Sequence, residues 1–323
     1  MKNILILFAF LTLCNCSNPV IEHGKKIVIA HRGASGYLPE HTMEAKAMAY
    51  GMGPDYIEQD VVLSKDNVPI VIHDILLDDV TDVQTKFTNR SRSDGNHYVI
   101  DFTFKELQTL NVTERFSTTS AKQLYPNRFP INTSSFRLHS LQQEIELIQG
   151  LNTSTGKKIG IYPEIKNPKF HLKEGKDISK IVLQILTDYG YTRKKDNCIL
   201  QCFDADELER IRKKLHSNLY LVQLIETPFE TKKLEHYATY ANGIGSWYKQ
   251  ILDKKVNNKW TFTNLVSNAH KLNLKVHPYT FRADDLGDFD SFKEMVDVLL
   301  YQAKADGGFT DFPNKMLEII SKK

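Results

Sequence analysis

The sequence predicts an α/β fold, a distorted (β/α)₈ barrel in which parallel strands alternate with helices. Nine short runs rich in β-branched residues recur along the chain, and helical patterns lie between most of them. No phosphate-binding G-x-G-x-x-G or Walker motif follows any of these runs, which disfavours an open, doubly wound sheet. The 323 residues are enough to build one closed barrel.

The strands are expected, in order, at residues 26–30, 56–63, 68–74, 158–165, 198–203, 219–225, 242–247, 274–279 and 307–312. Two of the intervening helices have clear start signals, Thr42 and Ser140 as N-caps, and Gly51 and Gly150 are expected to end them.

The second and third runs are too close together to be joined by a parallel crossover. Such a crossover needs about a dozen connecting residues, whereas the turn signal here is only Lys65-Asp66-Asn67. The two runs are therefore expected to form an antiparallel pair. This pairing brings His73 back towards Glu58 and Asp60.

The strand pattern breaks after Asp74 and resumes near Ser140. The intervening stretch is rich in Asp, Thr, Ser, Asn and Arg and has one helix-like piece at 103–110. We interpret residues 75–139 or so as an insertion after the third strand, within a single barrel domain spanning residues 24–323.

Residues 1–16 resemble a signal peptide. The apolar run from Ile4 to Leu13 is too short to cross a bilayer core of about 30 Å, but it suits a signal-peptide core. Cys14 and Cys16 each follow a loose bacterial lipoprotein cleavage pattern, and an ordinary cleaved signal is the alternative. The chain is expected to be exported and anchored to a membrane through a lipid on Cys14 or Cys16, in the periplasm, in the outer membrane or at the cell surface.

The charge pattern argues against a nucleic-acid partner. The net charge is +3, from 42 basic and 39 acidic residues spread along the chain without a dense basic stripe. A small-molecule substrate is expected instead.

Polar residues gather at the carboxyl ends of the predicted strands, where α/β barrels build their active sites. Within a strand, side chains two apart point the same way. The residues at these ends are His31, Arg32, Glu58, Asp60, His73, Asp74, Glu164, Lys166, Gln201 and Phe203. A single carboxylate or histidine at a strand end is most often structural, so the prediction depends on their convergence.

Together these residue types indicate metal-assisted phosphoryl transfer. The carboxylates of Glu58, Asp60 and Glu164 are hard oxygen ligands, which suit one Ca²⁺ or Mg²⁺ ion better than Zn²⁺, with Ca²⁺ favoured. Arg32 and Lys166 would offset the remaining negative charge and bind an anionic phosphate. His31 and His73 would supply an acid and a base near neutral pH.

At these residues the sequence resembles the glycerophosphodiester phosphodiesterases, and most closely their bacterial periplasmic type. The matching stretches are "AHRGASGYLPEHT", "IEQDVVLSKDNVPIVIHD", "DGNHYVIDFTFKEL", "GIYPEIKNPKFH", "LQCFDADEL", "VHPYTFR" and "GGFTDFP". The resemblance runs from about residue 26 to the end of the chain. It implies a barrel of the phospholipase C type that hydrolyses glycerophosphodiesters, such as glycerophosphocholine, to sn-glycerol 3-phosphate and an alcohol.

The resemblance also implies roles for individual residues. His31 and His73 match the catalytic pair, Arg32 matches the phosphate-binding arginine, and Lys166 matches the lysine beside the third metal ligand. The metal ligands map onto Glu58, Asp60 and Glu164. The further substrate-contact candidates are Glu40, Gln201, Phe203 and Tyr279, and His41 is a weaker site candidate.

Two other functions stay open at this stage. Lipid phosphodiesterases such as phosphatidylinositol phospholipases and sphingomyelinase D share the barrel, the two histidines and the acidic site. A surface-binding lipoprotein with vestigial activity is the other, although the intact set of site residues argues against it. The sequence leaves open the preferred alcohol, the histidine that acts as base, attack by water or by a neighbouring hydroxyl, and the oligomeric state.

Overall fold

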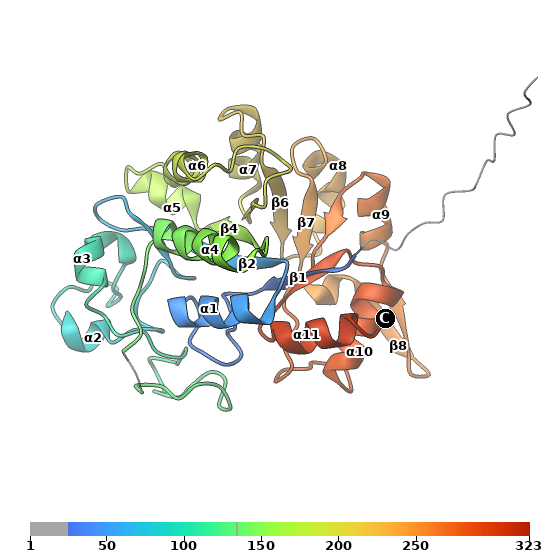
Figure 1. The fold of residues 1–323 in the computed structure, drawn as a ribbon, viewed down its shortest axis with the longest axis horizontal. Coiled ribbons are helices and arrows are strands. Elements are labelled where there is room, and N and C mark those ends of the chain that lie inside the picture. The colour runs from blue at the N-terminus through green and yellow to red at the C-terminus, as the bar shows by residue number, and fades with distance from the viewer. Residues whose placement is uncertain (1–24, 134) are drawn as a thin grey trace, which may run out of the picture.

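Eight parallel strands form a nearly closed barrel in the computed structural model, which describes residues 25–133 and 135–323 (Figure 1). The strands are β1 (Ile27–Ala30), β2 (Tyr56–Leu63), β4 (Gly160–Ile165), β5 (Ile199–Cys202), β6 (Tyr220–Ile225), β7 (Gly243–Ser246), β10 (Lys275–Val276) and β11 (Gly307–Thr310). Their order is β10-β7-β6-β5-β4-β2-β1-β11. The amide of Phe309 donates to the carbonyl of Pro278 at 3.0 Å and so joins the two ends of the sheet. The predicted fold class is confirmed.

The predicted antiparallel pair is also present. β3 (Pro69–Val71) pairs antiparallel with β2, with Val61 opposite Val71. The turn between them places Asn67 in the left-handed region, at φ 63°. Asparagine tolerates this conformation better than most residues.

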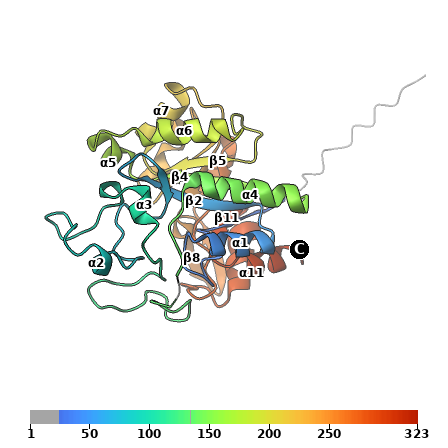
Figure 2. The same ribbon diagram turned by 60° about the vertical axis from the view of Figure 1, so that its left-hand side comes forward.

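The helices cover the outside of the barrel (Figures 1 and 2). They are α1 (Met43–Met52), α4 (Leu141–Thr155), α5 (Pro168–Lys173), α6 (Ile178–Asp188), α7 (Ala205–Lys213), α8 (Leu234–Tyr237), α9 (Leu265–Lys271), α10 (Phe292–Val296) and α11 (Pro313–Ile320). A hairpin that was not predicted, β8 (Leu252–Val256) with β9 (Lys259–Phe262), lies beside them.

The predicted helix starts are confirmed and the predicted ends are wrong. Thr42 accepts a hydrogen bond from the amide of Ala45, and Ser140 accepts one from the amide of Gln143. However, α1 continues through Gly51 to the left-handed cap Gly53, and α4 continues through Gly150 to Gly156. A glycine inside a helix costs only about 1 kcal/mol, so neither internal glycine stops its helix.

Residues 75–133 and 135–139 form a layer of short elements and loops against β2 and β3, which includes the helices α2 and α3 labelled in Figure 2. These elements are α2 (Val83–Lys86), a short 3₁₀ turn at Val99–Asp101 and α3 (Phe104–Leu107). Their apolar side chains, among them Phe102 and Leu107, pack with Val62, Ile70 and Ile72 in one cluster. The layer is therefore held to the barrel by a shared apolar core.

The side chains inside the barrel show which strand positions face inward. Ile29, Tyr162, Ile199, Val222 and Phe309 form a buried cluster inside the barrel. Because side chains two apart in a strand point the same way, the residues two and four positions further along also face inward. The polar strand ends therefore converge above this apolar layer.

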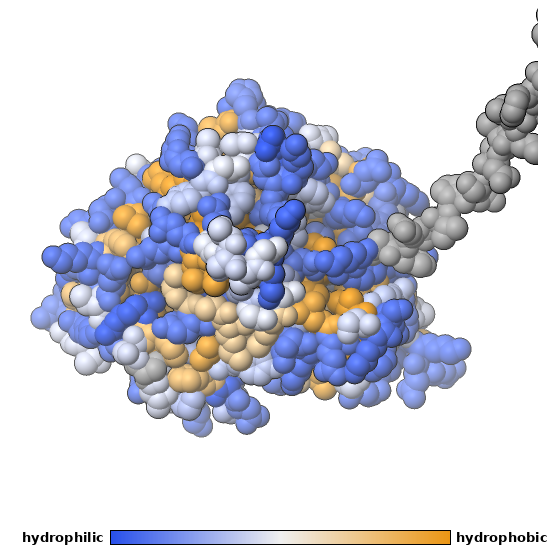
Figure 3. Space-filling model, viewed as in Figure 1, coloured by the Kyte–Doolittle hydropathy of each residue, from blue (hydrophilic) through white to orange (hydrophobic). Residues whose placement is uncertain are grey.

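The surface seen from the side of Figure 1 is mostly hydrophilic, with smaller hydrophobic areas between the polar residues (Figure 3). Across residues 25–133 and 135–323, the structure has no helix long and apolar enough to cross a membrane. The predicted signal peptide, with Cys14 and Cys16, lies outside the described residues.

Candidate active site

A pocket of about 840 Å³ opens at the carboxyl ends of the barrel strands. It is lined by ten of the sequence-predicted site residues, namely His31, Arg32, Glu58, Asp60, His73, Glu164, Lys166, Gln201, Phe203 and Tyr279, whereas Glu40, His41 and Asp74 are not among its lining residues. Most of these residues follow the inward-facing positions described above: His31 follows Ile29, Glu164 and Lys166 follow Tyr162, and Gln201 and Phe203 follow Ile199. The strand register thus brings together residues that are far apart in the sequence.

His31 is paired with Asp311, at the end of the neighbouring strand β11. Nδ1 of His31 lies 2.6 Å from Oδ1 of Asp311, and both side chains are buried. Burial opposes ionisation of Asp311, but Arg282, His31 and Arg128 hold its pKa well below the usual range. An ionised carboxylate can only accept, so Nδ1 of His31 carries the proton and the unprotonated Nε2 is left for the pocket.

His73 forms a second pair of the same kind. Its Nδ1 lies 2.7 Å from Oδ1 of the adjacent Asp74, whose pKa is lowered by His73 and Arg115 against the effect of burial. Burial, Arg32 and Lys166 lower the pKa of His73 below 6.5. Burial and Arg32 lower the pKa of His31 to about 4, although Asp311 acts in the opposite direction. Both rings are therefore neutral at pH 7 and able to accept a proton.

Three carboxylates face the same pocket, and burial and mutual repulsion oppose the ionisation of all three at once. Burial and Asp60 raise the pKa of Glu58 well above its usual value, and burial and Asp60 also raise that of Glu164 to about 8. Burial opposes ionisation of Asp60 as well, but Lys166, His73 and His41 keep its pKa low. Oδ1 of Asp60 is buried and has no hydrogen-bond partner. A divalent cation would allow all three carboxylates to ionise together, and it could also bind the unpartnered Oδ1 of Asp60.

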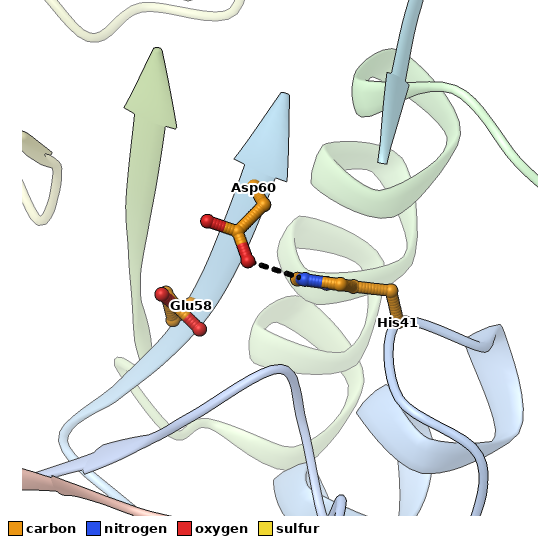
Figure 4. Close-up of side chains that lie close together, drawn as sticks. All are labelled: His41, Glu58 and Asp60. Atoms are coloured by element: carbon orange, nitrogen blue, oxygen red, sulfur yellow. Dashed lines mark hydrogen bonds and ion pairs between the residues drawn. The ribbon is translucent and has the colours of Figure 1, made fainter. Parts of the chain in front are cut away.

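His41 lies next to this carboxylate cluster. His41, Glu58 and Asp60 bring their ligand atoms within 4.8 Å of one another, so these three side chains could also hold a metal ion (Figure 4). Nε2 of His41 lies 2.7 Å from Oδ2 of Asp60, and His41 is not among the residues that line the pocket. Burial and Lys46 lower its pKa to about 3. A neutral His41 can donate its Nε2 proton to Asp60 and leave Oδ1 of Asp60 facing the site.

The two predicted phosphate-binding cations of the pocket, Arg32 and Lys166, are fixed by acidic neighbours. Lys166 lies 2.8 Å from Glu164 and 3.6 Å from Asp60. Arg32 occupies a left-handed conformation, at φ 57°, and its amide donates to Oε2 of Glu58 at 2.7 Å. Left-handed backbone is uncommon for a residue other than glycine. Here it turns the chain at the end of β1 so that the backbone of Arg32 meets the acidic cluster.

Glu40 lies outside the main pocket. Its Oε2 accepts from Nη1 of Arg32 at 2.8 Å, and its Oε1 accepts from Nη2 of Arg115 at 2.6 Å. The structure therefore places this sequence-predicted substrate contact between two arginines, where it orients the Arg32 guanidinium.

The sequence analysis missed several residues of this site. Asp311 follows inward-facing Phe309 by two positions, so the same alternation rule could have identified it. Arg115 and Arg128 lie in the irregular 75–139 region, where no periodicity signals their position. Trp247 follows β7, lines the pocket and is 42% exposed.

Comparison with known proteins identifies the family. The model of the glycerophosphoryl diester phosphodiesterase family matches residues 31–315. The chain belongs to this family. The sequence-based resemblance is confirmed, as is the prediction that the chain is a phosphoric diester hydrolase of this kind.

Relatives in this family align along almost the whole chain. The glycerophosphodiester phosphodiesterase of Haemophilus influenzae is 46% identical, over 91% of this chain and 90% of the relative. That of Treponema pallidum is 37% identical, over 92% of each.

Solved structures of glycerophosphodiester phosphodiesterases share the fold. A Silicibacter pomeroyi protein assigned to this class superposes with a TM-score of 0.72, at 20% identity over 92% of this chain and 93% of that one. A phosphodiesterase of Oleispira antarctica, solved with the product sn-glycerol-3-phosphate, gives a TM-score of 0.63 at 20% identity, over 91% and 96%.

Proposed function

We propose that this glycerophosphodiester phosphodiesterase hydrolyses small glycerophosphodiesters, such as glycerophosphocholine, to sn-glycerol 3-phosphate and an alcohol. In this proposal one divalent cation, Ca²⁺ rather than Mg²⁺, assists the reaction, and His31 and His73 act as acid and base. The observation that carries the proposal is the pocket itself. Two histidines, each paired with a carboxylate, line the same pocket as three acidic side chains, Arg32 and Lys166.

Arg32 and Lys166 would bind the phosphodiester. Guanidinium can donate two parallel hydrogen bonds to phosphate oxygens, and the ammonium of Lys166 adds a compact positive charge. Both cations are largely buried, with side-chain exposures of 14% and 10%. The electrostatic attraction between these cations and a phosphate is stronger in a buried site than it would be in bulk water.

One histidine would take a proton at Nε2 from the attacking oxygen. The other would enter the reaction as the imidazolium, with a second proton taken from solvent at Nε2 beside the anionic phosphodiester, and would deliver that proton to the leaving alkoxide. Asp74 and Asp311, bonded to the two Nδ1 atoms, would stabilise the imidazolium that forms when a ring accepts a proton. Because Nδ1 of both rings is engaged, each ring can exchange protons with substrate only through Nε2.

Glu58, Asp60 and Glu164 would hold the cation, with His41 orienting Asp60. Such an ion supplies Lewis-acid stabilisation of charge on the phosphoryl oxygens. Carboxylate oxygens suit Ca²⁺, which accepts more ligands and a looser geometry than Mg²⁺.

The test is release of sn-glycerol 3-phosphate from glycerophosphocholine by the purified protein, with Ca²⁺, with Mg²⁺ and with excess chelator. Chelator-sensitive release that Ca²⁺ restores best is the expected result. Parallel assays with lysophosphatidylcholine and sphingomyelin test the alternative lipid phosphodiesterase. Cleavage of these lipids without cleavage of glycerophosphocholine would overturn the proposed substrate class.

We also propose that the protein is exported and anchored by a lipid on Cys14 or Cys16. The support is the apolar run of residues 4–13 followed by these two cysteines. Cells that express the wild type, Cys14→Ser or Cys16→Ser are labelled with a radioactive fatty acid. The wild type should carry the label. One of the two single variants should lose it, and the cysteine replaced in that variant is the lipidated one. Labelling of the Cys14→Ser/Cys16→Ser double variant would exclude both sites.

A further inference from the structure

We propose that Arg115 and Arg128, both from the 75–139 region, are positioning residues that each fix one of the two histidine–carboxylate pairs. The inference deepens the proposed function and depends on its assignment of His31 and His73. The 75–139 region would then be part of the catalytic machinery and not merely an addition to the outside of the barrel.

Arg115 fixes the His73 pair. Its Nη1 lies 2.7 Å from Oδ2 of Asp74, whose other oxygen contacts Nδ1 of His73. Its Nη2 lies 2.6 Å from Oε1 of Glu40, which in turn bonds to Arg32. The Arg115 guanidinium thus holds both Asp74, which bonds to His73, and Glu40, which bonds to Arg32.

Arg128 fixes the His31 pair in the same manner. Its Nη2 lies 2.7 Å from Oδ2 of Asp311, whose other oxygen contacts Nδ1 of His31. It also donates to both oxygens of Asp284, at 2.8 and 3.1 Å, and to the carbonyl of Ser35. Its guanidinium carbon lies 3.7 Å from the centre of the Tyr125 ring. The Arg128 side chain is only 4% exposed.

Both arginines therefore have the same relation to a histidine. In each pair the arginine takes the carboxylate oxygen that the histidine does not use. Charge-assisted hydrogen bonds are shorter and stronger than neutral ones and hold the carboxylate in one orientation. A fixed, ionised carboxylate in turn fixes the ring plane and keeps the proton on Nδ1, so Nε2 stays available to the pocket.

The two pairs differ in how many cations support them. Asp311 also accepts from Nε of Arg282 at 2.9 Å on the same Oδ2 that Arg128 uses, whereas Arg115 is the only arginine, among the described residues, in contact with Asp74. Loss of Arg115 should therefore impair catalysis more than loss of Arg128.

The test compares Arg115→Gln and Arg128→Gln with a matched control, Arg92→Gln. Arg92 lies in the same region but pairs with Asp101 and Glu174, away from both histidines. We expect kcat for glycerophosphocholine to fall about 10–100-fold in the two test variants, as expected when reacting groups lose their alignment. The effect on KM should be smaller for Arg128→Gln than for Arg115→Gln, because only Arg115 supports Arg32 through Glu40. Arg115→Lys and Arg128→Lys should recover part of the lost kcat.

A spectroscopic measurement separates positioning from general stability. In ¹⁵N-histidine NMR spectra of the wild type, His31 and His73 should appear with the proton on Nδ1. Arg115→Gln should change the His73 signals and leave those of His31 in place, and Arg128→Gln should do the reverse. The Arg92→Gln spectrum should match the wild type for both rings.

If Arg128→Gln fails to fold, Asp284→Asn/Arg128→Gln removes the opposing charge as well and leaves Asp311 paired with Arg282. If Arg115→Gln fails to fold, Asp74→Asn/Arg115→Gln leaves Glu40 paired with Arg32 and should match Asp74→Asn alone in kcat. A kcat within about twofold of wild type in the folded Arg115 and Arg128 variants would overturn the inference.

Variants His31→Ala and His73→Ala are measured in the same series. Retained turnover in those variants would refute the proposed acid–base function. Lost turnover there, with full turnover in the arginine variants, would refute only the positioning role.

Discussion

The carboxylate of Asp311 lies 2.6 Å from Nδ1 of His31, although 280 residues separate the two along the chain. The contact exists because β1 and β11 are neighbouring parallel strands, with Ala30 opposite Thr310. Each of the two residues directly follows its strand, so the register that closes one side of the barrel also builds the pair. The predictions below follow from this arrangement and from the groups around it.

Removal of either histidine should abolish most turnover. We expect His31→Ala and His73→Ala to lower kcat for glycerophosphocholine by about 10²–10⁴-fold, the usual contribution of a general acid or base. His97→Ala is less useful as a control because His97 is buried and bonded to Asp78. His216→Ala, at an exposed position shortly after α7, should be fully active. Near-normal turnover in both test variants would contradict the acid–base assignment.

We expect the acidic limb of the profile of kcat/KM against pH to lie below pH 6.5. A base must be unprotonated, and the pKa of His73 is lowered from 6.5, while that of His31 is lowered to about 4. Activity is therefore retained as the pH falls from 7 to 6.5 and is lost at lower pH as the histidine that acts as base becomes protonated.

The same profile should respond to Asp74. The hydrogen bond from His73 to Asp74 raises the pKa of that ring, so Asp74→Asn should move its limb to still lower pH while reducing kcat. An acidic limb above pH 6.5 in the wild type, or an upward shift in Asp74→Asn, would contradict this account.

Metal binding should stabilise the protein through the three pocket carboxylates. A ligand at 100 times its Kd adds about 2.7 kcal/mol to the free energy of unfolding, so saturating Ca²⁺ should raise the Tm of the wild type by several degrees. Glu164→Gln should lose most of this rise. Glu318→Gln, whose exposed carboxylate pairs with Lys322, should keep it. An equal Ca²⁺-induced rise in both variants would place the ion elsewhere.

Replacement of Arg32 by lysine should weaken substrate binding. Lysine keeps the charge but cannot donate two parallel hydrogen bonds, and a hydrogen bond to a charged group contributes about 1.5–3 kcal/mol. We expect Arg32→Lys to raise KM by about 10-fold or more. The exposed Arg193, which pairs with Asp196, provides the matched Arg193→Lys control. An unchanged KM in Arg32→Lys would mean that the arginine does not bind the phosphate.

Glu114 should limit stability at alkaline pH. It is only 1% exposed, its Oε2 has no partner, and burial with the nearby Glu40 raises its pKa to about 8. Between its ordinary value of 4.5 and about 8, the folded protein holds a proton that the unfolded chain has released, so the free energy of unfolding falls as pH rises. Glu114→Gln should raise Tm at pH 8 by about 2–4 °C.

At pH 4 the Glu114→Gln and wild-type proteins should melt at the same temperature, because Glu114 is then protonated in both folded and unfolded chains. A gain at pH 4 equal to that at pH 8 would show that packing, and not charge, causes the effect.

The barrel could be predicted from sequence because its strands are short, apolar and separated by helices, and because the gap between β2 and β3 is too short for a crossover. The ends of α1 and α4 could not be predicted from sequence, because each helix contains an internal glycine before the glycine that caps it. Gly53 and Gly156 adopt φ values of 84° and 72°, and nothing in the residue type distinguishes them from Gly51 and Gly150.

The pocket residues could be predicted because strand alternation is a local rule. Glu58, Asp60, Glu164 and Lys166 all follow from it. Arg115 and Arg128 could not be predicted in this way, since their positions depend on how an irregular segment packs against the barrel. The sequence shows their charge but not the carboxylates of Asp74, Glu40 and Asp311 that they meet.

The pairing of β1 with β11 also determines when the site can form. Contacts between distant parts of a chain form slowly, because loop closure costs entropy before the contact repays it. During synthesis, the ribosome must complete the last strand before Asp311 can reach His31. A nascent or prematurely terminated chain ending before Gly307 would still contain Glu58, Asp60 and Glu164, yet His31 would have no Asp311. Any phosphodiester cleavage that depends on the His31–Asp311 pair therefore requires the last barrel strand to be in place.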